Sequence, residues 1–218
     1  MSPAQPAGYL AMPIAGKGRA VLVLHAWWGL NDTIKAVCNR LAESGFVAFA
    51  PDLYRGKVTD QIAEAEKLGA ALDSRVEQAR VELLNATTFL KECAGSDNSA
   101  ISVIGFSLGA YYALDLSVNA PNAVRSVVVF YGTGPGDYSK SQAEYLGHFA
   151  EIDSFEPPTN VNALEESLRQ AGRTVTFYRY SGVGHWFCEP DRMQAYNEAA
   201  ASLAWDRTIA FLSRTSVL

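Results

Sequence analysis

The sequence is poor in cysteine, with three residues among 218, at positions 38, 93 and 188. An odd number of widely spaced cysteines does not build a disulfide framework, and no two of them have the spacing of a zinc site. We therefore expect reduced thiols, no metal ion, no cofactor and a cytoplasmic location, since stable disulfides belong to oxidising compartments.

Positive charge is also scarce. Lysine and arginine total 18 against 23 acidic residues, which gives a net charge of -5, and no run of basic residues occurs. A nucleic-acid surface needs the opposite balance, so we do not expect nucleic acid as a partner.

Long apolar runs are missing as well. No stretch reaches the roughly 18 consecutive apolar residues that a membrane span needs, and the first ten residues lack the pattern of a signal peptide. No internal repeat and no linker-like segment interrupts the chain. With 49% hydrophobic residues, the sequence predicts one soluble domain over residues 1–218, away from membranes, as a monomer or a small homo-oligomer.

Strand and helix patterns alternate from residue 19 onward. Apolar, strand-like runs occupy residues 19–25, 46–50, 100–105, 125–131, 144–149 and 175–180, with an edge strand at 8–13. Helical patterns fill 31–45, 59–91 in two pieces, 107–119, 157–172 and the C-terminal segment. This alternation predicts an α/β fold with a doubly wound, mostly parallel sheet and helices on both faces. Functional residues of such sheets gather at the carboxyl ends of the strands.

One of these strand ends carries the pattern Gly-x-Ser-x-Gly, at residues 105–109. A strand precedes it and a helix follows it, which is the order of a nucleophile elbow, where a sharp turn exposes the serine hydroxyl. Ser107 is therefore the candidate nucleophile. The alternative is a glycine-rich turn with an incidental serine.

A serine nucleophile needs a base within hydrogen-bonding reach. His185 follows the last strand in a tight Gly-Val-Gly-His-Trp turn, and we predict that it is this base. His25 ends the first buried strand and is expected to shape the loop that follows. His148 lies inside a strand, where a packed core histidine is the simpler interpretation.

The base in turn needs a carboxylate, which in this architecture lies between the serine and the histidine in chain order. Asp153 follows the strand at 144–149 and is the favoured candidate. Asp137, after the preceding strand, is the alternative. Glu151 and Glu156 are expected to be solvated loop residues.

Two backbone N–H groups are expected to form an oxyanion hole. The amide of Leu108 lies at a helix N-terminus, and the amide of Trp27 lies in the loop after the first buried strand. Side chains near the strand ends predict an aromatic pocket, although ordinary packing is the alternative for each. The candidates are Trp27, Trp28, Tyr54, Arg55, Phe106, Tyr131, Phe155 and Trp186.

Five short segments occur in a characteristic order along the chain: residues 8–13 (GYLAMP), 25–31 (HAWWGLN), 50–54 (APDLY), 105–109 (GFSLG) and 184–187 (GHWF). Together they resemble the dienelactone hydrolase family, the carboxymethylenebutenolidases and their relatives among the α/β-hydrolases. The resemblance implies an α/β-hydrolase fold without a large cap. It also implies a triad of Ser107, Asp153 and His185, and an oxyanion hole from the amides of Leu108 and Trp27.

The sequence departs from that family at its functional positions. The family pattern has a cysteine where this chain has Ser107 and a glutamate where it has Ala26. Of two arginines that would hold a substrate carboxylate, one falls at Gly56, beside Arg55, and the other at Glu189. An anionic lactone would meet weaker attraction here.

These features favour a serine hydrolase that cleaves a small-molecule ester or lactone through an acyl-enzyme on Ser107. One alternative is a true dienelactone hydrolase that uses Arg55 or Arg192 for the carboxylate. Another is a non-catalytic small-molecule binder on the same fold. A nucleotide-binding domain ranks last, because no glycine-rich phosphate loop follows the first strand. We interpret Cys188 as a buried thiol and not as a second nucleophile.

Overall fold

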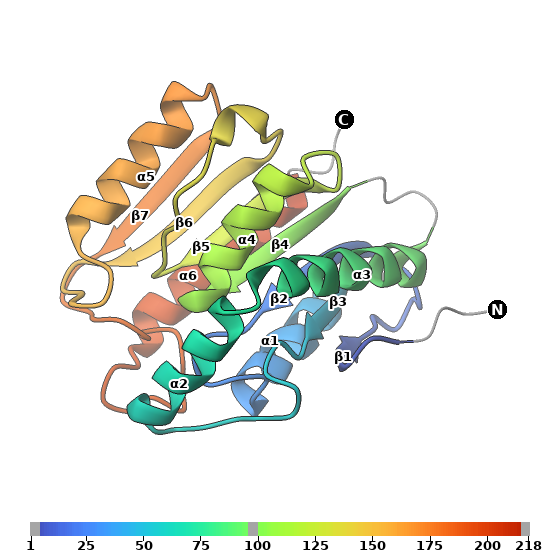
Figure 1. The fold of residues 1–218 in the computed structure, drawn as a ribbon, viewed down its shortest axis with the longest axis horizontal. Coiled ribbons are helices and arrows are strands. Elements are labelled where there is room, and N and C mark those ends of the chain that lie inside the picture. Colours follow the sequence, from blue (N-terminus) through green and yellow to red (C-terminus); the bar gives the residue numbers. More distant parts are fainter. Residues whose placement is uncertain (1–4, 96–99, 215–218) are drawn as a thin grey trace.

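A seven-stranded sheet runs through the computed structural model, which describes residues 5–95 and 100–214 (Figure 1). The strand order is β1-β3-β2-β4-β5-β6-β7, and β1 alone is antiparallel to its neighbour. The strands are β1 (Gly8–Ala11), β2 (Arg19–Leu24), β3 (Phe46–Pro51), β4 (Ile101–Phe106), β5 (Val124–Phe130), β6 (Glu144–Ala150) and β7 (Val175–Tyr180).

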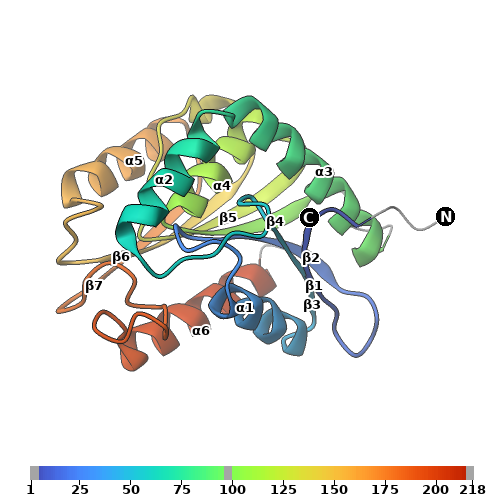
Figure 2. The same cartoon turned by 60° about the horizontal axis from the view of Figure 1, so that its bottom comes forward.

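Helices cover both faces of this sheet, as Figure 2 shows. Those on one face are α1 (Asp32–Glu43) and α6 (Glu198–Arg214). Those on the other are α2 (Ile62–Asp73), α3 (Val76–Ala94), α4 (Leu108–Asn119) and α5 (Pro158–Gln170), and a short 3-10 turn, η1 (Tyr138–Lys140), precedes β6. In the described parts of the chain, no helix has the length and apolarity needed to cross a bilayer. The predicted doubly wound α/β-hydrolase fold is confirmed.

The alternation of side chains along each strand builds two separate cores. Along β2, Leu22 and Leu24 pack with the helices α3 and α4, whereas Val21 and Val23 pack with α1 and α6. All four side chains are fully buried. A strand covered on both faces needs apolar residues at every position, which explains the continuous apolar runs of the sequence.

Local signals set the ends of the helices. Asn31 caps α1, its side-chain oxygen accepting from the N–H of Ile34 at 3.1 Å, and Gly45 leaves the helix with a φ of 87°. The predicted two-piece helix over 59–91 is α2 and α3, separated at Ser74 and Arg75. The polar segment at 95–99, between the helical pattern and the strand-like run of the sequence, is expected to be a turn, and its residues 96–99 lie outside the described residues.

The turn between β4 and α4 brings backbones into unusually close contact. A Cβ at Gly105 would overlap the carbonyl oxygen of Gly109, and a Cβ at Gly109 would overlap the carbonyl oxygens of Leu24 and His25. Helix α4 can therefore lie against the end of β2 only because these two residues lack side chains.

We predict that Gly109→Ala lowers the free energy of unfolding by at least ~2 kcal/mol, because backbone atoms of β2 cannot yield to the added methyl group. Urea unfolding of the purified variant measures this. Gly69→Ala is the matched control: Gly69 is also helical, its nearest neighbour, the Trp27 ring nitrogen, is at an ordinary 3.4 Å, and alanine favours helix there. Equal stability of the two variants would contradict the packing argument.

Candidate active site

Ser107 leaves the carboxyl end of β4 in a strained backbone conformation. Its φ is 49° and its ψ is -113°, and its N–H donates to the carbonyl of Phe130 at 2.9 Å. This bond ties the turn to the neighbouring strand β5. The side chain is half-buried, so its hydroxyl remains accessible. Strain held in place by surrounding structure is a common mark of a functional turn.

Ser107, His185 and Asp153 form a continuous chain of hydrogen bonds. The Oγ of Ser107 lies 2.9 Å from Nε2 of His185, and Nδ1 of His185 lies 2.7 Å from Oδ2 of Asp153. A carboxylate can only accept, so Nδ1 carries a proton and Nε2 is left to accept from the serine hydroxyl. The structure thus brings together the three side chains that the sequence singled out.

The loop after β6 holds the carboxylate of Asp153. Its second oxygen, Oδ1, accepts from the backbone N–H of Phe155 at 2.9 Å and of Glu156 at 2.8 Å. Asp137, the alternative acid, is exposed instead, and its side chain interacts with Ser139 and Lys140. Among the two candidates, Asp153 is therefore the one that contacts the histidine.

The other two histidines are buried away from Ser107. The Nδ1 of His25 donates to the carbonyl of Ala26 at 2.8 Å and so supports the backbone just before Trp27. His148 bonds the hydroxyls of Tyr180 and Thr208, at 2.8 and 3.0 Å, and burial lowers its pKa to about 3. It is a core histidine that stays neutral.

A pocket of about 270 Å³ opens beside the serine. Trp27 and Leu108 both line it, at the ends of β2 and β4. Leu108 is the first residue of α4, where an N–H has no partner within its own helix. The remaining lining residues are Ser107, Tyr111, Tyr131, Gly132, Thr133, Phe155, Glu156, His185 and Trp186.

Aromatic rings gather around the histidine on one side of this pocket. Phe155 packs against His185 at 5.1 Å and against Trp186 at 4.8 Å, and Trp27 meets Phe155 edge-on at 6.0 Å. Phe155 is 46% exposed, so it forms part of the rim. Tyr131 also contacts the His185 ring, with 4.9 Å between the ring centroids.

Four of the predicted pocket residues do not line this pocket in the described structure, and their placement corrects the prediction. Trp28 and Tyr54 are buried in the two cores, and Arg55 points to Glu82, with which it forms an ion pair at 3.0 Å. Phe106 precedes Ser107 on β4, so strand alternation turns its ring to the opposite face of the sheet.

The sequence prediction missed Tyr111, Gly132 and Thr133, and it assigned Glu156 to solvent. Glu156 is half-buried because its carboxylate accepts from the backbone N–H of Thr133 at 2.8 Å and from its hydroxyl at 3.0 Å. Gly132 and Thr133 could have been found in the sequence because they directly follow a predicted strand. The burial of Glu156 could not, because its partner follows a different strand from its own. In residues 5–95 and 100–214, no three His, Cys, Asp or Glu side chains are grouped as a metal site requires.

The sequence model of the dienelactone hydrolase family matches residues 7–216. This chain belongs to the dienelactone hydrolase family. It is 34% identical to "Protein usf" of Aquifex pyrophilus, over 94% of this chain and 91% of that protein. It is 31% identical to the "Putative carboxymethylenebutenolidase" of Aquifex aeolicus, over 94% and 91% respectively.

Solved structures of the family share the fold. A dienelactone hydrolase-like promiscuous phosphotriesterase, P91, from metagenomic libraries superposes with a TM-score of 0.85 at 22% identity. The match covers 95% of this chain and 92% of that one. Membership in the dienelactone hydrolase family makes this chain a hydrolase.

Glu189 occupies the position where the resemblance implied an arginine. The carboxyl is buried and accepts from the Tyr131 hydroxyl at 2.7 Å. Burial raises the pKa of Glu189 to about 8, although the bond from Tyr131 and the nearby charge of Arg192 oppose the shift. Tyr131 also contacts His185, so this tyrosine lies between the buried carboxyl of Glu189 and the histidine of the active site.

We predict that Glu189 makes stability fall as pH rises. Because its pKa is raised, Glu189 keeps a proton in the folded chain that the unfolded chain releases above about pH 4.5. Its contribution to the free energy of unfolding is therefore fully present below pH 4.5 and is lost as the pH rises to about 8. The slope reaches at most ~1.4 kcal/mol per pH unit. Glu189→Gln should flatten it, and urea unfolding of both proteins between about pH 5 and 8.5 measures this.

Glu166→Gln on the exposed face of α5 is the matched control, because it removes one carboxyl from a solvated position. This control should follow the wild-type pH profile. Parallel profiles for wild type and Glu189→Gln would show that Glu189 does not titrate as described.

Proposed function

We propose that this chain is a serine hydrolase that cleaves uncharged carboxylic esters or lactones through an acyl-enzyme on Ser107. The observation that carries the proposal is the unbroken chain of hydrogen bonds from Ser107 through His185 to Asp153. A protein that only binds a ligand has no chemical need for such a proton relay, which makes the non-catalytic alternative the weaker one.

The proposed reaction begins when the Ser107 oxygen attacks the carbonyl carbon and Nε2 of His185 takes its proton. Asp153 holds the imidazole and stabilises its positive charge. The N–H groups of Leu108 and Trp27 stabilise the negative oxygen of the tetrahedral intermediate. The protonated histidine then gives its proton to the leaving alcohol. Water cleaves the acyl-enzyme by the same steps in reverse order.

The charge of the pocket supports an uncharged substrate. Glu156 is the one carboxylate among the described residues that line the pocket, and these residues include no lysine or arginine. Arg55 pairs with Glu82, and Arg192 packs over the Trp28 ring at 4.2 Å and bonds Asp191. The two arginines that a true dienelactone hydrolase function would recruit are thus engaged elsewhere.

We predict that Ser107→Ala lowers kcat/KM for a short p-nitrophenyl ester at least ~1,000-fold, since the nucleophile is lost while the pocket remains. Ser139→Ala, a serine on the exposed turn η1, is the control and should retain wild-type activity. Mass spectrometry of wild type treated with a fluorophosphonate should place the label on Ser107. Wild-type turnover by purified Ser107→Ala would reject the proposal.

We also predict that Glu156→Gln shifts the preference toward anionic substrates. Glutamine keeps the shape and can still bond Thr133, but it removes the repulsion of a substrate carboxylate. The ratio of kcat/KM for an anionic ester to that for a neutral ester of equal size should rise roughly 3- to 10-fold, or about 1 kcal/mol. Glu151→Gln, in the same loop but outside the pocket lining, is the control. An unchanged ratio in Glu156→Gln would mean that Glu156 does not select for charge.

A further inference from the structure

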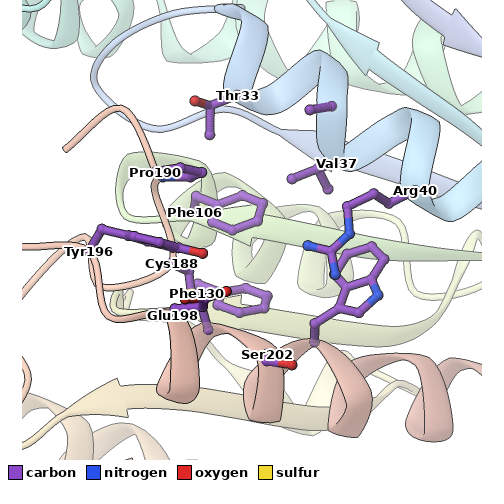
Figure 3. A pocket seen from close by; sticks show the side chains of 13 residues that line it. Thr33, Val37, Arg40, Phe106, Phe130, Cys188, Pro190, Tyr196, Glu198 and Ser202 are labelled. Atoms are coloured by element: carbon purple, nitrogen blue, oxygen red, sulfur yellow. The ribbon is translucent and has the colours of Figure 1, made fainter. Parts of the chain in front are cut away.

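A second cavity lies between α1 and α6, on the face of the sheet that these two helices cover (Figure 3). Its volume is about 270 Å³, and in the described structure it shares no lining residue with the pocket at Ser107. Helix α1 contributes Val37 and Arg40, α6 contributes Ala201 and Trp205, and the loop before α6 contributes Cys188. The reaction proposed above makes no use of this cavity.

Two phenylalanine rings form the apolar end of this cavity. Phe106 and Phe130 stack at 4.6 Å with an angle of 17° between their planes, and both project into the cavity in Figure 3. They are the last residues of β4 and β5, directly before Ser107 and Tyr131. A ligand lying on these rings would therefore contact the reverse side of the strands that carry the active site.

Arg40 supplies the one positive charge of the described lining. Its guanidinium stacks on the Trp205 ring, 4.1 Å from the centroid, and Figure 3 shows it reaching inward from α1 toward the two phenylalanines. In residues 5–95 and 100–214 no acceptor is hydrogen-bonded to this guanidinium. Stacking on Trp205 fixes the plane of the guanidinium and leaves its N–H groups free to donate. This geometry can bind a carboxylate through two hydrogen bonds.

Two other groups limit what can bind. Glu198, in the first turn of α6, also lines the cavity, and Figure 3 shows it on the side away from Arg40. The carboxylate of Glu198 would repel a second negative charge on a ligand held by Arg40, so the cavity disfavours a dianion. Burial raises the pKa of the Cys188 thiol, so that group remains neutral. The volume lies just below the ~300–1,000 Å³ of sites for drug-sized ligands, which indicates a small molecule.

We propose that this cavity binds a small monocarboxylic acid, with its carboxylate on Arg40 and its aromatic or short aliphatic body against Phe106 and Phe130. The acid released by ester hydrolysis has the same chemistry. The proposal does not depend on the proposed function, because it concerns binding at a site apart from Ser107.

Isothermal titration of the full chain with phenylacetate, and with phenylacetamide as the uncharged analogue, tests the proposal. Wild type should bind phenylacetate and discriminate against the amide. Arg40→Gln should weaken binding of phenylacetate by roughly tenfold or more, because two charge-assisted hydrogen bonds are lost. Lys35→Gln is the matched control, with the same charge change on the same helix outside the cavity, and should bind as wild type does.

A second variant, Ala201→Phe, fills the cavity and should also remove binding. Thermal unfolding of each variant establishes that it is folded before titration, and Arg40→Gln alone decides the question if Ala201→Phe does not fold. Equal affinity of wild type and Arg40→Gln would place the acid elsewhere, including the pocket at Ser107, and would overturn the proposal. Absence of phenylacetate binding to wild type in the millimolar range would also overturn it.

Discussion

The hydrogen bond between Nδ1 of His185 and Oδ2 of Asp153 is the interaction on which the candidate site depends. It joins the loops after β6 and β7, which are neighbouring parallel strands, so their carboxyl ends lie at one edge of the sheet. The backbone N–H groups of Phe155 and Glu156 hold the other carboxylate oxygen of Asp153. Without the hydrogen bond between His185 and Asp153, the imidazole could turn, and Nε2 would no longer be fixed toward the hydroxyl of Ser107.

Charge around this hydrogen bond is arranged in two different ways. Glu156 lines the pocket and is held in place by Thr133, so its charge acts on a ligand in the pocket. Glu189 lies behind the histidine, buried with Tyr131, and its raised pKa keeps the interior free of an unpaired charge over much of the neutral range. A carboxyl that favours its neutral form costs far less to bury than a carboxylate, which explains how an acid can occupy this position.

The sequence was sufficient for the fold and for the residues at strand ends, but not for the pocket wall. Ser107, Asp153 and His185 could be found because each follows a recognisable strand, and the chain order of the three is fixed by the architecture. Phe106 was misplaced because neighbours in sequence point to opposite faces of a sheet. Glu156 was misplaced because its hydrogen-bonding partner belongs to another strand, and such a pairing has no signature within one segment.

Sharp turns at the strand ends explain how one sheet carries two separate cavities. Phe106 and Phe130, the last residues of β4 and β5, line the cavity between α1 and α6. The residues that follow them, Ser107 and Tyr131, have positive φ values of 49° and 37° and line the serine pocket. The loop after His185 repeats this division: Trp186 lines one pocket and Cys188 lines the other. Glu189, the residue after Cys188, is anchored to Tyr131 by its buried hydrogen bond. This hydrogen bond therefore connects the end of β5, at the serine pocket, to the loop that lines the second cavity.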